Sequence, residues 1–164
     1  MALKYNVDEV LEMGQQIERN GRRFYVAAAG AARNEQVKAL LQRLADMEAR
    51  HEVLFGQMRA EAAQEGIPHA EFDPDFEVGR YLQCAADSHV FNVHKDLSEK
   101  LTGRETPQQV LKTALGFEKD TVVLFLGIKE LVPAELGKSR MDTLIKEEMS
   151  HIVDISSQLH ALQK

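Results

Sequence analysis

The sequence predicts an all-α protein in which four long helices form a bundle. Its 164 residues include only four prolines, ten glycines and no tryptophan, and they are rich in residues that favour helices. In four separate stretches, apolar residues recur at the three-and-four spacing of one helix face. A chain of this length can bury a substantial core, so we expect a single domain over residues 1–164.

The first two stretches predict a helical hairpin over about residues 6–66. Asn6 and Glu9 are spaced as a capping pair at the start of the first helix. The apolar period breaks at residues 30–34 and then resumes until Gly66. Because the break is only a few residues long, the two helices should be antiparallel neighbours.

The last two stretches predict a second hairpin over about residues 106–163. Thr106 and Gln109 are spaced as a capping box around a proline at the first helical position. Pro133 interrupts the period, and we expect Ser139 to cap the final helix.

A crossover of about 40 residues, over about residues 67–105, joins the hairpins. It is too long for a simple turn and long enough to travel the length of the bundle. The second and third helices can therefore run parallel, as in ferritin-like topology. One or two short helices within the crossover could cover the bundle.

Charge and composition exclude several classes of protein. A net charge of −6 is the wrong sign for binding nucleic acid. The longest apolar run, residues 122–128, is too short to span a membrane. The first residues lack the apolar segment of a secretory signal, so we expect a cytoplasmic protein. A single cysteine, Cys84, excludes internal disulfides and cysteine-ligated metal centres within one chain.

Six polar residues interrupt the apolar stripes where core side chains are expected. Burying an unpaired carboxylate is costly, so these residues need a common partner. Two of the helices carry the motif Glu-x-x-His, whose two side chains lie one turn apart and point the same way. The six residues are Glu18, Glu48, His51, Glu118, Glu148 and His151.

The same residues reveal an internal repeat. Glu18, Glu48 and His51 each have an identical residue 100 positions later, in the second hairpin. The midpoint between the first two, residue 33, falls in the hairpin loop, so their carboxylates should lie level with each other. The corresponding midpoint in the second hairpin is residue 133. All six side chains should therefore meet at mid-bundle.

Four carboxylates and two imidazoles in this arrangement are typical of a dinuclear carboxylate site. We expect two iron ions, with manganese or zinc as alternatives, because oxygen-rich ligation with one nitrogen per metal suits iron or manganese better than a lone zinc. Glu48 and Glu148 are expected to bridge, with the other four residues as terminal ligands. The empty site should be repulsive, so removal of metal should destabilise the protein.

Nearly the whole chain resembles the rubrerythrin branch of the ferritin-like di-iron proteins. The resemblance rests on Glu18, Glu48-Ala-Arg-His51, Glu118 and Glu148-Met-Ser-His151. It implies two irons that cycle between diferrous and diferric states while reducing hydrogen peroxide or dioxygen, often in a homodimer. Rubrerythrins proper also carry a four-cysteine rubredoxin domain that this sequence lacks, so the electrons should come from an external donor such as a rubredoxin-like protein or Fe(II). A further glutamate found in many members is replaced here by Thr121.

Four more residues lie near these motifs, and two of them, Tyr25 and Asp154, have alternative interpretations. Tyr25, two turns after Glu18, resembles a family tyrosine that lies beside the metals. It is either a catalytic electron or proton source or a hydrogen-bonded core aromatic. Asp154 could orient an imidazole or belong to a solvated helix face. Glu52 and Glu147 are turned about 100° from the motif residues, so we expect surface charges.

The leading hypothesis is a rubrerythrin-like oxidoreductase that protects against oxidative stress by reducing peroxide or dioxygen. A ferroxidase or iron-handling protein would use the same residues, with Fe(II) as substrate rather than catalyst. A structural or interaction bundle with an unused or zinc-filled site is the third hypothesis.

Overall fold

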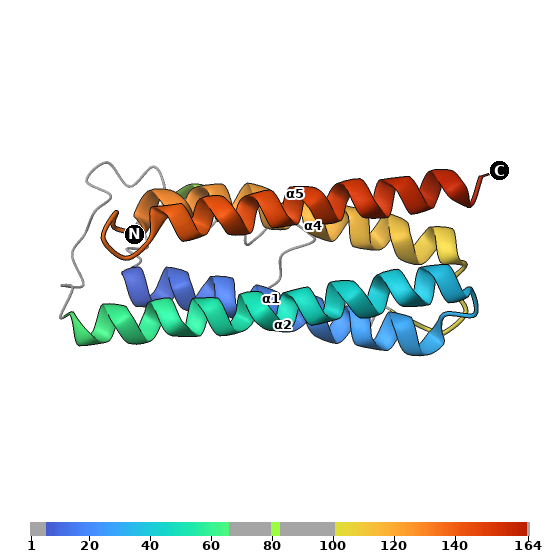
Figure 1. Cartoon of the computed structure of the whole chain (residues 1–164), viewed down its shortest axis with the longest axis horizontal. Helices are drawn as coiled ribbons and strands as arrows, with labels where there is room; N and C mark the ends of the chain where they lie inside the picture. Colours follow the sequence, from blue (N-terminus) through green and yellow to red (C-terminus); the bar gives the residue numbers. More distant parts are fainter. Residues whose placement is uncertain (1–5, 66–79, 83–100, 164) are drawn as a thin grey trace.

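The computed structural model describes residues 6–65, 80–82 and 101–163. It contains four long helices, so the predicted all-α class is confirmed (Figure 1). They are α1 (Val7–Ala31), α2 (Glu35–Gln64), α4 (Pro107–Leu131) and α5 (Lys138–Ala161). None of these helices has an apolar stretch long enough to cross a bilayer.

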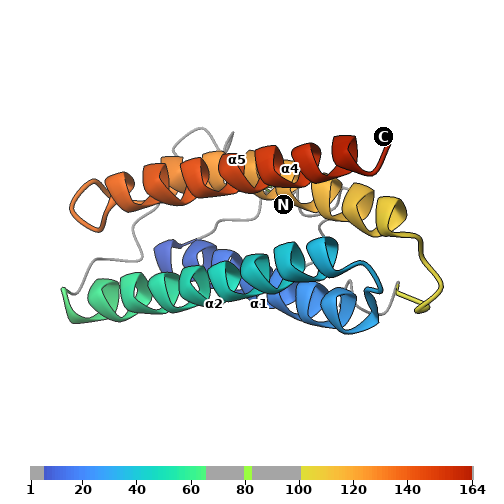
Figure 2. The same ribbon diagram turned by 45° about the vertical axis from the view of Figure 1, so that its right-hand side comes forward.

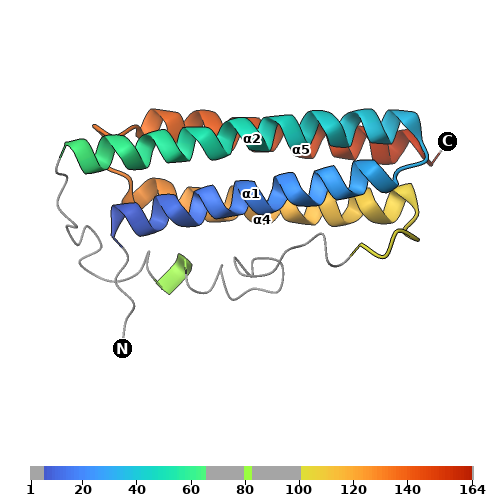
Figure 3. The same cartoon turned by 90° about the horizontal axis from the view of Figure 1, so that it is seen from below.

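The helices form two antiparallel hairpins that lie against each other. Helix α1 pairs with α2 and α4 pairs with α5, and the two pairs stack along their full length (Figures 1 and 2). Figure 3 shows that α2 and α4 run in the same direction. This is the predicted ferritin-like arrangement.

Most of the predicted crossover lies outside the described residues, which include residues 80–82 and 101–105 of it. The first of these two segments lies against α4. Residues 80–82 are helical. Leu82 is fully buried, and the Tyr81 hydroxyl donates a hydrogen bond to the Val123 carbonyl oxygen at 2.6 Å. A Cβ on Gly127 would lie 2.6 Å from the Tyr81 ring, so this glycine allows the segment to lie close to α4.

The sequence predicts the start of three helices correctly but not that of α5. Asn6 and Glu9 form a reciprocal capping box on α1, and Thr106 and Gln109 form another on α4. Helix α5 instead begins after Gly137, whose φ of 117° is readily adopted only by glycine. The expected cap at Ser139 was wrong because this left-handed turn starts the helix two residues earlier.

The core follows the internal repeat. Leu11 and Leu44 are fully buried. Their counterparts 100 residues later, Leu111 and Leu144, are at most 1% exposed. Towards one end of the bundle, the Phe55 and Phe125 rings pack edge to face with centroids 5.2 Å apart. Both hairpins therefore contribute equivalent apolar faces above and below the middle of the bundle.

Gly14 is required where α1 packs on α2. A Cβ at this position would lie 2.4 Å from the Phe55 ring, which is fully buried and cannot move freely. We expect Gly14→Ala to destabilise the protein by about 1–3 kcal/mol through overpacking. Gly116→Ala is the matched control, because its Cβ would meet nothing within 4 Å and alanine favours helix by about 0.5–1 kcal/mol. Urea unfolding of both variants checks this, and equal stability would contradict the packing.

Candidate metal centre

The middle of the bundle is occupied by polar side chains instead of apolar ones. All four helices contribute, and the residues are at most 3% exposed. The structure brings together every residue that the sequence predicted for the site. They are Glu18 on α1, Glu48 and His51 on α2, Glu118 on α4, and Glu148 and His151 on α5.

The six side chains form two overlapping groups, each with ligand atoms within 4.8 Å of one another. One group contains Glu18, Glu48, His51 and Glu148, and the other contains Glu48, Glu118, Glu148 and His151. Glu48 and Glu148 belong to both groups. The arrangement therefore suits two metal ions that share two carboxylates.

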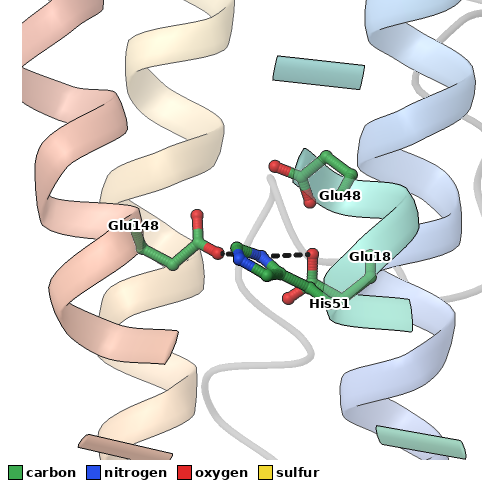
Figure 4. Close-up of side chains that lie close together, drawn as sticks. All are labelled: Glu18, Glu48, His51 and Glu148. Atoms are coloured by element: carbon green, nitrogen blue, oxygen red, sulfur yellow. Dashed lines mark ion pairs between the residues drawn. The ribbon is translucent and has the colours of Figure 1, made fainter. Parts of the chain in front are cut away.

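Glu148 lies between the two imidazoles. Its Oε1 is 2.8 Å from His51 Nδ1, and its Oε2 is 3.0 Å from His151 Nδ1. His51 Nδ1 is also 3.5 Å from Glu18 Oε2, and Figure 4 shows the His51 ring between these two carboxylates. The imidazole rings are nearly parallel, with centroids 5.8 Å apart. Both rings direct Nδ1 towards the shared carboxylates.

Most of the ligand atoms of the site make no regular hydrogen bond with the described residues. Both oxygens of Glu18, Glu48 and Glu148 and the Nδ1 atoms of both histidines are buried without a hydrogen bond, and their close polar contacts are with one another. Such groups are rare in native proteins because each carries a large desolvation penalty. Two divalent cations would supply the missing partners and balance four carboxylates. The residues present therefore fit a dinuclear metal centre.

Burial makes three of the carboxylic acids weak. It raises the pKa of Glu18 and Glu48 well above the ordinary value, and the neighbouring carboxylates add to the effect. Burial likewise raises the pKa of Glu118 to about 8. Without metal, the site therefore retains protons at neutral pH.

The pKa values of the two imidazoles and of Glu148 shift in the direction opposite to the one that burial alone would give. Burial lowers the pKa of His51, but the nearby Glu148 carboxylate outweighs it and raises the value to about 9. Burial is outweighed in the same way at His151, where Glu118 and Glu148 raise the pKa to about 10. At Glu148, burial is outweighed by the two histidines, which hold its pKa below the usual range. Glu148 is therefore the carboxylate that stays ionised when no metal is bound.

Tyr25 is in direct contact with the cluster. Its side chain is fully buried, and its hydroxyl donates a hydrogen bond to Glu118 Oε1. Burial and the Glu118 charge raise the pKa of Tyr25 well above its usual value, so the phenol keeps its proton. The repeat places Phe125 at the equivalent position, where no hydroxyl is available. Tyr25 therefore makes the two halves of the site chemically different.

The sequence missed the role of Glu147. We expected a surface charge, but Glu147 Oε2 lies 2.6 Å from His51 Nε2. Its side chain is 46% exposed, so it reaches from the surface of α5 to a histidine on α2. A turn of 100° from Glu148 is enough to face the neighbouring helix rather than solvent alone.

The other flanking residues turn away from the imidazoles. Asp154 pairs with Arg43 at 2.7 Å on the surface, which supports the solvated-face interpretation. Glu52 pairs with Arg19 at 2.8 Å and is partly buried. The buried Thr121 hydroxyl donates a hydrogen bond to the Phe117 carbonyl oxygen of its own helix.

The role of Gly21 could not be predicted from the sequence, where it is one of several small residues among the buried positions of α1. A Cβ there would lie 3.0 Å from Glu48 Oε2 and 2.8 Å from the Phe117 ring. A glycine at this position leaves room for the Glu48 carboxylate beside α1.

Comparison with known proteins agrees with this geometry. The family model described as Rubrerythrin matches residues 9–153, a range that includes all six residues of the cluster. Searches of curated proteins and of solved structures each found no significant match.

Proposed function

Because the chain belongs to the rubrerythrin family, we propose that it is a di-iron oxidoreductase that reduces hydrogen peroxide or dioxygen. The observation that carries the proposal is the pair of overlapping, buried ligand groups that share Glu48 and Glu148. These two carboxylates would bridge the irons. Glu18 and His51 would complete one metal position, and the other two cluster residues would complete the second.

The donor set favours iron or manganese over a lone zinc ion. Each position offers one imidazole nitrogen and oxygens from three carboxylates. Two divalent ions carry four positive charges, which balance the four negative charges of the ionised carboxylates. The filled site is then close to neutral, which removes the penalty of burying unpaired charges.

When bound, two ferrous ions supply two electrons, which together with two protons reduce one hydrogen peroxide to two waters. The chain's contribution is to hold both ions beside one another and to exclude bulk water. Fully buried aromatic side chains on the same helices, Phe24, Phe55 and Phe125, support this exclusion of water.

Tyr25 is the residue best placed to supply a proton or an electron. Its hydroxyl is buried and already donates to Glu118. We expect Tyr25→Phe to retain two metals per chain but to react with peroxide more slowly, by on the order of 100-fold if the phenol is the proton source. Metal analysis and stopped-flow absorbance measure the two effects separately. Phe125→Leu, at the equivalent position of the repeat, is the control, and an unchanged rate in Tyr25→Phe would leave the tyrosine a structural aromatic.

The electrons must return to the site from a donor outside these 164 residues. The sequence holds a single cysteine, Cys84, so these 164 residues cannot form a four-cysteine electron-transfer centre. We propose a small external donor, such as a rubredoxin-like protein, or Fe(II) itself.

Anaerobic loading with Fe(II) followed by rapid mixing tests the function. The proposal predicts saturation at two irons per chain and faster iron oxidation by hydrogen peroxide than by dioxygen. Faster reaction with dioxygen and uptake of further iron would instead indicate an iron-handling protein. Zinc-loaded protein is the control, because it has the same charge and no redox chemistry. Failure of the bound iron to react with either oxidant would contradict the proposal.

A further inference from the structure

The two histidines of the cluster differ in the surroundings of Nε2, the ring nitrogen that does not face the shared carboxylates. His51 Nε2 lies 2.6 Å from Glu147 Oε2. His151 Nε2 is buried and has no hydrogen-bond partner among the described residues. The six cluster residues are identical in the two halves of the repeat, so the Glu147 contact, together with the Tyr25 hydrogen bond to Glu118, distinguishes the two metal positions.

The repeat explains the difference. Glu147 directly precedes Glu148 on α5, and the equivalent position on α2, 100 residues earlier, is Met47. Both residues are partly buried, which fits equivalent places in the two hairpins. A thioether is only a weak acceptor, so Met47 offers no counterpart to the Glu147 carboxylate.

A carboxylate behind a metal-binding imidazole has two effects. With Nδ1 directed at the metal, the Nε2–H donates to Glu147, which fixes the tautomer and the orientation of the ring. The negative charge also increases the electron density on Nδ1 and so strengthens its bond to the metal. Loss of such a partner commonly reduces metal affinity 10- to 100-fold.

We propose that Glu147 is a positioning residue that makes the His51 half of the centre the tighter metal position, whereas the His151 half, which has Met47 in place of a carboxylate, binds more weakly. This inference rests on the proposed metal centre. Partial loading should therefore fill the His51 position first, and chelators should empty the His151 position first.

Single-site variants allow each half to be measured alone. His151→Ala leaves the His51 half intact, and His51→Ala leaves the other. We expect Co(II), which is redox-stable and whose visible spectrum reports its ligands, to bind about 10- to 100-fold more tightly to His151→Ala than to His51→Ala. In the His151→Ala background, adding Glu147→Met should weaken Co(II) binding by about the same 10- to 100-fold. In the His51→Ala background, it should leave the Co(II) affinity unchanged.

The repeat also supplies a gain-of-function test and a control. Met47→Glu should strengthen Co(II) binding only where His151 is present. Glu52→Gln removes a nearby charge that pairs with Arg19 rather than with an imidazole, so it should have little effect. Circular dichroism confirms that each variant is helical.

The outcomes separate the inference from the proposed function. Equal affinities in the two single-site backgrounds, or equal weakening of both by Glu147→Met, would overturn the role of Glu147 while leaving the metal centre intact. Failure of the unmodified protein to bind Co(II) at all would overturn the metal centre itself.

Discussion

The Glu48→Gln variant is expected to lose nearly all of its bound metal, and Glu148→Gln should behave in the same way. Each of these carboxylates belongs to both ligand groups, so a neutral amide at either position would remove negative charge and a carboxylate oxygen from both proposed metal positions. Glutamine has nearly the same shape, so the metal-free fold should persist. Elemental analysis after Fe(II) loading and desalting measures the loss.

Glu18→Gln is the matched control for this prediction. Glu18 is equally buried, but it belongs to only one of the two groups. It should therefore weaken one position and leave about one metal per chain. Glu48→Gln protein that keeps both metals would contradict the bridging assignment.

The second large effect is the pH dependence of the metal-free protein, which should become less stable as the pH rises from about 6 to 9. The pKa of Glu118 is raised to about 8, so the folded protein keeps a proton that the unfolded chain has already lost. His51 and His151, with pKa values raised to about 9 and 10, also hold protons longer in the folded state. Where the folded state binds more protons than the unfolded state, stability falls with rising pH.

Glu148 does not oppose this trend. Its lowered pKa gives stability that is complete above about pH 4.5 and is lost only in stronger acid. Across the window from pH 6 to 9, we expect a decrease on the order of a few kcal/mol in the free energy of unfolding.

Bound metal should reverse this behaviour because it takes the place of the retained protons. Metal affinity should then increase with pH, and binding in weakly buffered solution should release protons. Each occupied position should stabilise the fold by about 4 kcal/mol at a free metal concentration 1,000 times the Kd. Thermal unfolding with and without metal at several pH values measures both trends.

Glu118→Gln is the control for the titration, because it removes one of the groups and should flatten the pH dependence of the metal-free protein. A higher unfolding temperature at pH 9 than at pH 6 for the metal-free protein would contradict the electrostatic account.

The features that could be predicted from the sequence are those that the two hairpins share. The capping pairs at Asn6 and Thr106 are local signals, and the structure contains both. The carboxylates and imidazoles of the cluster were identifiable because they repeat at one offset and interrupt apolar stripes. Fold class and the meeting of the six side chains follow from that regularity.

The features that could not be predicted are those in which the hairpins differ. Glu147 contacts His51, but nothing in the repeat signals this because its counterpart is Met47. Gly137 begins α5 by a left-handed turn, and no periodicity reports such a backbone conformation. Tyr25 had two equally good interpretations, and its hydrogen bond to Glu118 is compatible with both of them.

The most direct test of the account is anomalous diffraction from crystals of the protein loaded anaerobically with Fe(II). The account predicts two iron peaks about 3.5–4 Å apart, both between the carboxylates of Glu48 and Glu148. One peak should lie beside His51 and the other beside His151. A single peak, or iron bound only at the surface of the bundle, would contradict a dinuclear centre built from these six residues.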